Sequence, residues 1–278
     1  MMKLSKKILL SMAVLAASAM TNSPLARAEE TATLEQQTNE ALAKKLANPI
    51  SDLISVPLQL NYDAIGPHTD GSRWTLNVQP VIPIQVSPEL MIISRTIVPI
   101  MFQDQLFPGA GYQAGIGDIL QSIFLSPKLD DQSWTVGGGP VLQIPSATDK
   151  LLGAGKWGAG PTAVVIKLSG PWTYGALVNH VWSFAGDSNR MSVSKTFFQP
   201  VLAYTTPSAW TYAINTESTY DWIGKDLSIP INLIVTKLVK IGNQRVSVGA
   251  GLRYWAKSID NGPEGLGGRA VFTMLFPE

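Results

Sequence analysis

Apolar and polar side chains alternate along residues 74–86, WTLNVQPVIPIQV. The even positions begin with Trp74 and carry mainly Leu, Val and Ile, whereas Thr75, Asn77 and Gln79 occupy odd positions. A period of two is the side-chain period of a β-strand. Strands of soluble sheets are usually about 5–6 residues long, but a tilted strand that crosses a bilayer needs about 9–11. The pattern therefore predicts a membrane-crossing strand with one face toward lipid and the other toward a wet interior.

The same alternation recurs along the chain and predicts twelve strands. They lie near residues 52–62, 73–87, 90–103, 116–126, 133–145, 156–169, 171–184, 191–205, 209–222, 226–239, 245–256 and 267–276. Tight turns rich in Pro, Gly and Ser alternate with generally longer connections, an asymmetry typical of outer-membrane barrels. Backbone polar groups in lipid are satisfied by helices or closed barrels. The predicted fold class is all-β, an antiparallel transmembrane β-barrel of about twelve strands over residues 51–278.

The tryptophans support this arrangement independently of the turns. Trp134, Trp172 and Trp210 lie near the predicted inner strand ends, and Trp74, Trp157, Trp182, Trp222 and Trp255 lie near the predicted outer ends. Aromatic rings with a polar tip are enriched at both interfaces of a membrane. We therefore expect all eight tryptophans to belong to two girdles.

Prolines and glycines inside the predicted strands indicate an irregular barrel. Pro57, Pro80, Pro83, Pro99, Pro140, Pro161, Pro200 and Pro230 cannot donate to a ladder, so each is expected at a bulge or a non-donating position. Neither of the glycine-rich stretches 137–139 and 158–160 opens a helix, as a phosphate cradle requires. We interpret these glycines as bends or close approaches of the backbone.

The N-terminus indicates export. Residues 1–28 combine a basic start, a short apolar run and an Ala-Arg-Ala ending, which predicts a signal peptide cleaved after Ala28. No later apolar run approaches the length of a membrane helix. Residues 29–50 form the predicted N-terminal segment, with a helix over 29–47 that ends before Asn48 and Pro49. This helix is either a loose periplasmic leader or is tucked into or under the barrel mouth.

Composition excludes several classes of function. The signal peptide holds four of the 21 basic residues and none of the 20 acidic ones, so the mature chain has 17 basic and 20 acidic residues, a formal charge of −3. This balance does not suggest a nucleic-acid partner. The chain has no cysteine, which removes disulfides and thiolate metal sites. We expect no metal and no cofactor.

Few charged residues lie inside the predicted strands, and several fall on the polar stripe. Candidates for lining the lumen or a constriction are Arg95, Asp118, Glu217, Arg253 and Arg269. Rings of charged side chains set selectivity in pores, but ion pairs can also simply fill a narrow barrel. Both interpretations remain open. We expect Glu217 to face the lumen and to pair first with Arg253 and second with Arg269, because an ionised carboxylate facing hydrocarbon is costly.

His180 is the strand histidine, and its parity places it on the lipid-facing stripe near the outer girdle. Ser192 and Ser194 begin the next strand, so a serine nucleophile with a histidine base on the outer wall would be similar to outer-membrane phospholipases. No G-x-S-x-G context supports a nucleophile. We therefore predict an interfacial histidine, no catalytic residues and no enzyme activity.

Several phrases of the sequence resemble one family. They are LANP at 46–49, ISVP at 54–57, NVQPVIP at 77–83, GDI at 117–119, KWGAGPT at 156–162, ALVNHVWS at 176–183, NTES at 215–218 and GLRYWA at 251–256. They resemble bacterial outer-membrane proteins labelled as components of the phenol meta-cleavage pathway, as transporters or, misleadingly, as neuromedin U. The similarity covers nearly all of the mature chain. It implies a barrel linked by name to aromatic compounds, and it supplies no established catalytic residues.

The functional prediction is a passive outer-membrane channel for small molecules, aromatic or otherwise hydrophobic ones included. The alternatives are a closed structural barrel and a surface lipid hydrolase. Expected partners are outer-membrane lipids, a small-molecule solute and the barrel-assembly machinery. The assembly machinery is expected because the last strand alternates and ends near the aromatic Phe276, as is common in barrel proteins. The sequence leaves the solute, the openness of the lumen and the oligomeric state undecided.

Overall fold

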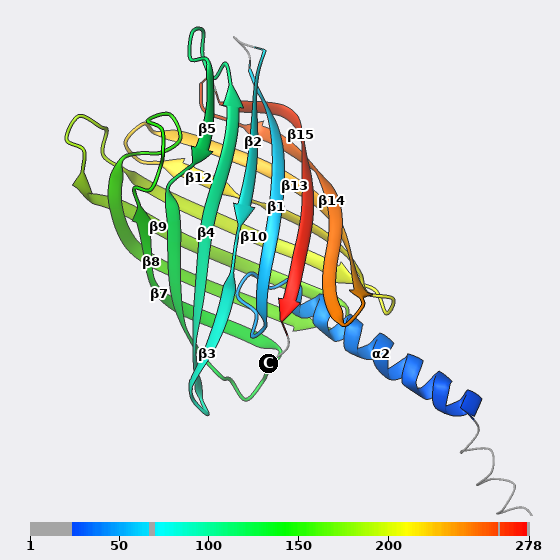
Figure 1. Cartoon of the computed structure of the whole chain (residues 1–278). Coiled ribbons are helices and arrows are strands. Elements are labelled where there is room, and N and C mark those ends of the chain that lie inside the picture. The colour runs from blue at the N-terminus through cyan, green and yellow to red at the C-terminus, as the bar shows by residue number, and fades with distance from the viewer. Residues whose placement is uncertain (1–23, 67–69, 261, 277–278) are drawn as a thin grey trace, which may run out of the picture.

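The chain folds into a closed antiparallel β-barrel preceded by one helix, in a computed structural model that describes residues 24–66, 70–260 and 262–276 (Figure 1). The predicted fold class is confirmed. Most of the predicted signal peptide lies outside the described residues, so its cleavage stays a prediction. The elements are α2 (Pro24–Leu46), β1 (Ile54–Ile65), β2 (Gly71–Val78), β3 (Val81–Ser87), β4 (Leu90–Asp104), β5 (Tyr112–Ile116), β6 (Ile119–Pro127), β7 (Trp134–Ile144), β8 (Lys156–Ser169), β9 (Trp172–Gly186), β10 (Ser194–Thr205), β11 (Trp210–Thr216), β12 (Ser218–Asp221), β13 (Asp226–Ile241), β14 (Gln244–Lys257) and β15 (Pro263–Phe276).

The fifteen strand segments of the described chain form twelve barrel strands, because three of these strands are each interrupted once. We call each complete barrel strand a stave. β2 continues into β3, β5 into β6, and β11 into β12. Neighbouring staves pair antiparallel, and β15 returns to β1, with Phe276 opposite Ile54. Closure leaves no unpaired edge. β4 has 15 residues and β13 has 16, beyond the about 9–11 needed to cross a bilayer.

The interruptions fall at residues that disturb a ladder or its alternation. Gln79 and Pro80 separate β2 from β3, and Glu217 separates β11 from β12. Gly117 and Asp118 separate β5 from β6, and here the alternation inverts: even positions are exposed in β5 and buried in the second half of β6. An extra residue in a bulge produces this inversion.

Two of the eight strand prolines, Pro80 and Pro230, lie where the ladder is irregular, as predicted. Pro80 lies in an interruption, and the register of β13 against β14 shifts between Ile229 and Pro230. Pro140 lies opposite Pro161 on β7 and β8, so two residues without an N–H share one rung.

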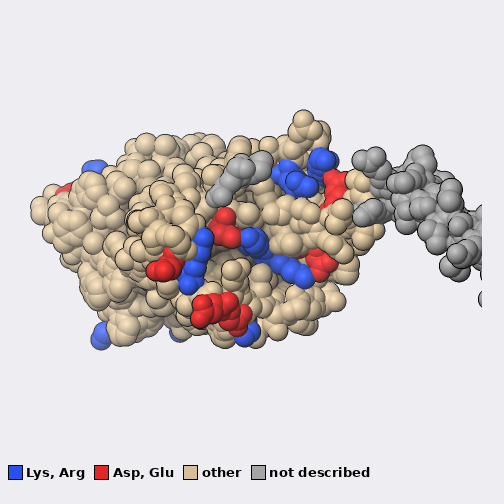
Figure 2. Space-filling model, turned by 90° about the horizontal axis from the view of Figure 1, so that it is seen from below, with Lys and Arg blue, Asp and Glu red and all other residues tan. Residues whose placement is uncertain are grey.

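The two ends of the barrel differ in their connections. We call the end that carries α2 and Phe276 the inner end and the opposite end the outer end (Figure 1). Connections at the inner end include the two-residue turns 88–89, 170–171 and 242–243, whereas the outer end carries the long connection 145–155. This asymmetry is that of outer-membrane barrels. Seen from below, charged side chains of both signs gather across the middle of the visible face, while the rest of the visible surface is mainly uncharged (Figure 2).

The outward face of the barrel is apolar and aromatic. The exposed tryptophans are Trp74, Trp134, Trp157, Trp172, Trp182, Trp210 and Trp222. The prediction that all eight tryptophans join the girdles is wrong for Trp255. Its side chain shares the inward stripe of β14 with Arg253, and its indole Nε1 donates to Asp63 Oδ1 at 2.7 Å inside the barrel.

The C-terminal part of helix α2 contacts the inner end of the barrel, and its N-terminal part projects away from the barrel (Figure 1). Its Ala43 packs in a buried apolar cluster with Ala209, Leu238 and Leu275. Lys240 pairs with Glu35 of the helix at 3.2 Å. Within the described residues, no helix has the length and apolarity needed to cross a membrane.

Residues 47–53, which we call the strap, connect α2 to β1 by crossing the inner end of the lumen. The Nδ2 of Asn48 donates to Thr135 Oγ1 on β7 at 3.0 Å, and its Oδ1 accepts the N–H of Ile50 at 3.0 Å. This turn directs Ile50 inward, where its exposed fraction is 0%. The cluster around Ile50 consists of Val81, Ile93, Phe124, Val164, Ile166 and Leu177, which come from five different strands.

The close approach predicted for Gly160 is confirmed, because a Cβ at this position on β8 would overlap the carbonyl oxygen of His180 on β9. Gly268 on β15 instead has open space where a Cβ would lie. We expect Gly160→Ala to destabilise the barrel by about 1–3 kcal/mol, the usual cost of overpacking. Gly268→Ala, the matched control, should be neutral. The measurement is the temperature at which the unboiled gel band shifts, and equal midpoints for both variants would contradict this assignment.

Candidate functional site

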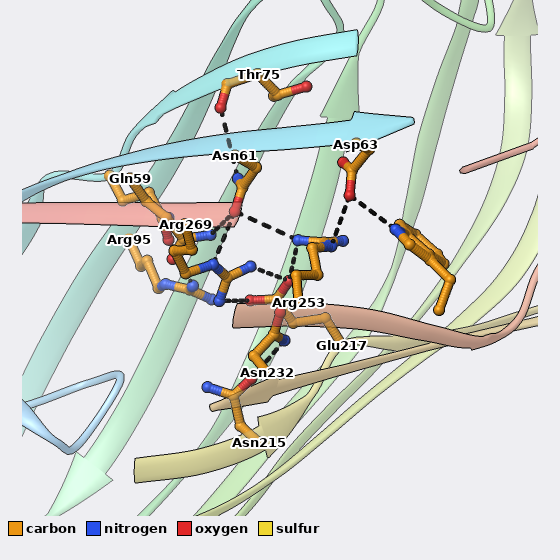
Figure 3. A network of polar contacts seen from close by, with 12 residues as sticks. Gln59, Asn61, Asp63, Thr75, Arg95, Asn215, Glu217, Asn232, Arg253 and Arg269 are labelled. Carbon is orange, nitrogen blue, oxygen red and sulfur yellow. Dashed lines mark hydrogen bonds and ion pairs between the residues drawn. The ribbon is translucent and has the colours of Figure 1, made fainter. Parts of the chain in front are cut away.

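The candidate site is a network of charged and amide side chains across the lumen (Figure 3). Inward positions of β1, β14 and β15 supply Asn61, Arg253 and Arg269, and Glu217 projects from the interruption between β11 and β12. The interruption faces Pro230, whose carbonyl accepts the N–H of Glu217 at 3.4 Å. The site is therefore assembled from staves at the two ends of the barrel sequence, which closure brings together.

Glu217 lies between two arginines. Arg269 donates two hydrogen bonds to the Glu217 carboxylate, from Nη1 to Oε1 at 3.0 Å and from Nη2 to Oε2 at 2.8 Å. Arg253 donates from Nη1 to Oε2 at 3.2 Å. The side chains are 17% exposed for Glu217, 10% for Arg253 and 1% for Arg269. Buried, two-pronged guanidinium–carboxylate contacts of this kind fix geometry as well as charge.

Residues of β1 and β14 hold the two arginines in place. Asn61 Oδ1 accepts from Arg269 Nε at 2.7 Å and from Arg253 Nη1 at 3.4 Å. Asp63 Oδ1 lies 3.1 Å from Arg253 Nε, as an ion pair without hydrogen-bond alignment. Trp255, whose indole donates to Asp63, also has its ring 4.7 Å from the Arg253 guanidinium carbon. The positive charge of Arg253 is thus shared between two carboxylates and an aromatic face.

Two further arginines line the lumen and bond to neutral amides. Arg95 on β4 donates from Nη2 to Gln79 Oε1 at 2.9 Å. Arg73 on β2 donates from Nε to Gln103 Oε1 at 3.0 Å. Neither arginine takes part in an ion pair among the described residues.

The lumen is hollow on both sides of the network. An outer cavity of about 350 Å³ is lined by Arg73, Arg253, Trp255 and Glu217 among others. An inner cavity of about 200 Å³ is lined by Arg95, by strap residues and again by Glu217. Because Glu217 borders both cavities, the ion-paired network lies between them, and we call this network the constriction.

The strap closes the inner cavity toward the inner end. Asn48 and Ser51 line this cavity on one face and a third cavity of about 250 Å³ on the other. Lys45 and Asp52, an exposed ion pair at 2.7 Å, border the third cavity. The strap therefore separates the inner cavity from the third cavity at the inner end.

Asp118 is not brought to this network. In the gap between β5 and β6, its carboxylate accepts the N–H of Ala154 at 2.6 Å, the N–H of Ala147 at 3.4 Å and Nε2 of Gln143 at 3.4 Å. These bonds hold the connection 145–155 against the outer end of the barrel. Asp118 therefore shares the inward parity of β6 and bonds the inward side chain of Gln143, but it lies at the outer end of the barrel, away from Glu217 and its arginines.

His180 lies on the outward face among aromatic residues. Its Nδ1 is 2.7 Å from Thr196 Oγ1, which also accepts from Trp222 Nε1 at 2.8 Å, and its ring centroid is 4.0 Å from that of Trp182. Ser194 Oγ is 3.4 Å from Nε2, longer than the about 2.6–3.2 Å expected of a nucleophile and its base. The geometry is that of an interfacial histidine in the outer girdle.

Sequence reasoning missed Asp63, Arg73 and Trp255. Asp63 and Arg73 flank a connection that was predicted to begin at residue 63, whereas β1 continues to Ile65 and β2 begins at Gly71. The missed signal was the continuing polar stripe Gln59, Asn61, Asp63 on alternate positions. Trp255 carried a similar signal, because it is two residues from Arg253.

The arrangement can discriminate solutes by size and charge, since fixed charges and a narrow passage are the two elements of pore selectivity. Within the described ranges, no group of three or more His, Asp or Glu side chains is placed to hold a metal ion. The chemistry that these residues support is binding through hydrogen bonds and charge.

Comparison with known proteins gives matches at the level of structure. No family model matches the sequence. No curated protein matches it either. The label connected with phenol degradation therefore stays a prediction.

Among solved structures, the barrel is similar to an outer membrane channel from Pseudomonas putida F1, with a TM-score of 0.62 and 14% identity over 80% of this chain and 94% of that one. The NanC porin gives a TM-score of 0.49 and 11% identity over 81% of this chain and 100% of that one. Outer membrane phospholipase A from Escherichia coli gives a TM-score of 0.46 and 8% identity over 84% of this chain and 98% of that one. At 14% identity, the first likeness shows a shared fold.

Proposed function

We propose that this chain is a passive channel of the bacterial outer membrane for small molecules, aromatic or otherwise hydrophobic ones included. The observation that carries the proposal is the pair of cavities, about 350 and 200 Å³, that meet at one constriction inside a closed barrel. A lumen filled only for stability has no need of space on both sides of its ion pairs. The Pseudomonas putida protein with this fold is described as an outer membrane channel, which supports the same function.

Both cavities combine polar walls with some apolar side chains. Phe197, Trp255 and Ile259 are the large apolar residues of the outer cavity. Val201 and Ile234 are among the apolar residues of the inner cavity. Such apolar side chains can contact the body of a solute whose polar group bonds the rest of the wall. The resemblance to proteins labelled with phenol degradation points to the same solutes.

Location and partners belong to the same proposal. The apolar outer wall with its exposed tryptophans fits lipid contact, and the signal-like residues 1–28 fit export followed by cleavage. The alternating strand β15, which ends at Phe276, fits recognition by the barrel-assembly machinery.

The test is solute flux through the purified full-length protein in liposomes. We expect swelling with small neutral solutes such as benzyl alcohol and glycerol, and none with a solute too large for the constriction, such as a trisaccharide. Empty liposomes are the control. A sealed structural barrel predicts no swelling with any solute. Phospholipid hydrolysis that disappears in His180→Ala would favour the surface hydrolase instead.

A further inference from the structure

The charges in the lumen do not balance, and the imbalance is positive. Arg253 and Arg269 are matched by Glu217 and Asp63, at contacts of 2.8–3.2 Å. Arg73 and Arg95 make no contact at ion-pair distance: their described side-chain hydrogen bonds go to Gln103 and Gln79, although Asp63 lies opposite Arg73 in the ladder and Glu217 borders the same cavity as Arg95. Among the charged residues of the network and the two cavities, four arginines thus face two carboxylates, which leaves two arginines in excess.

The two excess arginines lie on opposite sides of the constriction. Arg73 lines the outer cavity and Arg95 lines the inner cavity. Glu217, the carboxylate that borders both cavities, is held by Arg269 and Arg253. Each cavity therefore offers a guanidinium that makes no direct ion pair among the described residues, and Glu217, the carboxylate between the cavities, is already bonded to two other arginines.

Each excess arginine faces a cavity that also has apolar walls. In the outer cavity the apolar residues include Phe197 and Ile259. In the inner cavity they include Val81 and Val201. One cationic fork beside an apolar surface is complementary to a molecule with a carboxylate at one end and a hydrocarbon or aromatic body.

We propose that Arg73 and Arg95 are successive binding stations for small organic anions, and that the preferred solutes are monocarboxylates with an apolar body. This inference rests on the proposed channel function and names its substrate class. A guanidinium carries five N–H donors in a planar fork that matches a carboxylate, and each of these arginines has one described hydrogen bond, which leaves donors for a solute. Two stations of moderate strength allow entry as well as release, which conduction requires.

The experiment compares matched solutes in liposomes that contain the full-length protein. Benzoate, benzamide and benzylammonium share a ring and differ in charge, and acetate shares the charge without the ring. We expect benzoate to enter about tenfold faster than benzamide, the fold-change that corresponds to one charge-assisted hydrogen bond. Acetate and benzylammonium should enter more slowly than benzoate. A potassium chloride gradient should give a reversal potential on the anion-selective side.

Two substitutions assign the preference to the arginines. Arg73→Gln and Arg95→Gln should each reduce the ratio of benzoate to benzamide uptake, and the double variant should abolish it. Arg95→Lys, which keeps the charge, should retain the anionic reversal potential even where the glutamine variant assembles poorly. Lys237→Gln is the matched control, because Lys237 packs over Trp210 on the outward face and its loss should change nothing.

The outcomes separate the inference from the function on which it rests. Equal uptake of benzoate, benzamide and benzylammonium by the wild-type protein would overturn the anion stations and leave the channel intact. Faster uptake of benzylammonium would overturn them as well. No flux of any solute would overturn the channel and the inference together. These results come from the wild-type protein and do not depend on how the variants fold.

Discussion

Glu217→Gln is expected to lower the stability of the barrel by about 3–5 kcal/mol, the usual cost of removing one partner from a buried ion pair. The glutamine is nearly isosteric, so the change removes charge rather than volume. Arg269, whose side chain is 1% exposed, would lose both of its contacts to an anion and keep Asn61. Arg253 would keep Asp63. The loss of stability therefore comes mainly from leaving the buried guanidinium of Arg269 without an anionic partner.

The measurement is the temperature of the gel-mobility shift together with the reversal potential. The matched control is Glu89→Gln in an exposed turn at the inner end, which should move neither value. If the network sets selectivity, Glu217→Gln should also strengthen anion preference, because it adds one unbalanced positive charge to the constriction. A lower shift temperature with an unchanged reversal potential would assign the network to stability. If neither value moves, Glu217 is solvated and the described network does not persist in the membrane.

Alternation alone was enough to predict the barrel and the inward direction of Glu217, Arg253 and Arg269. In a membrane barrel one face of each strand contacts lipid and the other faces the lumen. The polarity of a side chain and of its neighbours along the strand therefore predicts which face it occupies. The twelve staves followed because Pro, Gly and Ser mark the turns. The two arginine partners of Glu217 were predicted from the proximity of the last strands, but their order is reversed: Arg269 makes the two-pronged contact and Arg253 a single hydrogen bond.

What alternation could not predict lies where the ladder is interrupted or ends. Asp118 lies in the interruption between β5 and β6, and no sequence signal shows that its carboxylate binds the connection 145–155. Asp63 and Arg73 were missed because strand ends are the least certain boundaries. The strap was missed for another reason. Its position depends on contacts between Ile50 and residues more than thirty positions away, and local periodicity does not report such contacts.

Ile50→Ala is expected to release the strap and to increase conductance through the inner end of the barrel. Ile50 is fully buried in the lumen, and truncating a buried isoleucine to alanine costs about 2–5 kcal/mol. Besides Ile50, the strap is held by the hydrogen bond from Asn48 to Thr135 and by Leu53, which packs at its β1 end against Ala209, Leu238 and Leu275. Ile50 is the strap's fully buried side chain in the lumen, so its truncation should loosen the middle of the strap while the ladders remain intact.

The comparison is single-channel conductance of Ile50→Ala and of Ile241→Ala, a matched truncation of an isoleucine exposed at an inner turn. We expect higher conductance and faster trypsin cleavage after Lys44 or Lys45 for Ile50→Ala alone, with the gel-shift temperature of the barrel preserved. The reasoning is that the strap is not part of any ladder, so its release opens the path between the inner cavity and the inner end without unpairing a strand. Faster cleavage with unchanged conductance would show that the strap moves without obstructing solutes, and the constriction at Glu217 would then limit flow by itself.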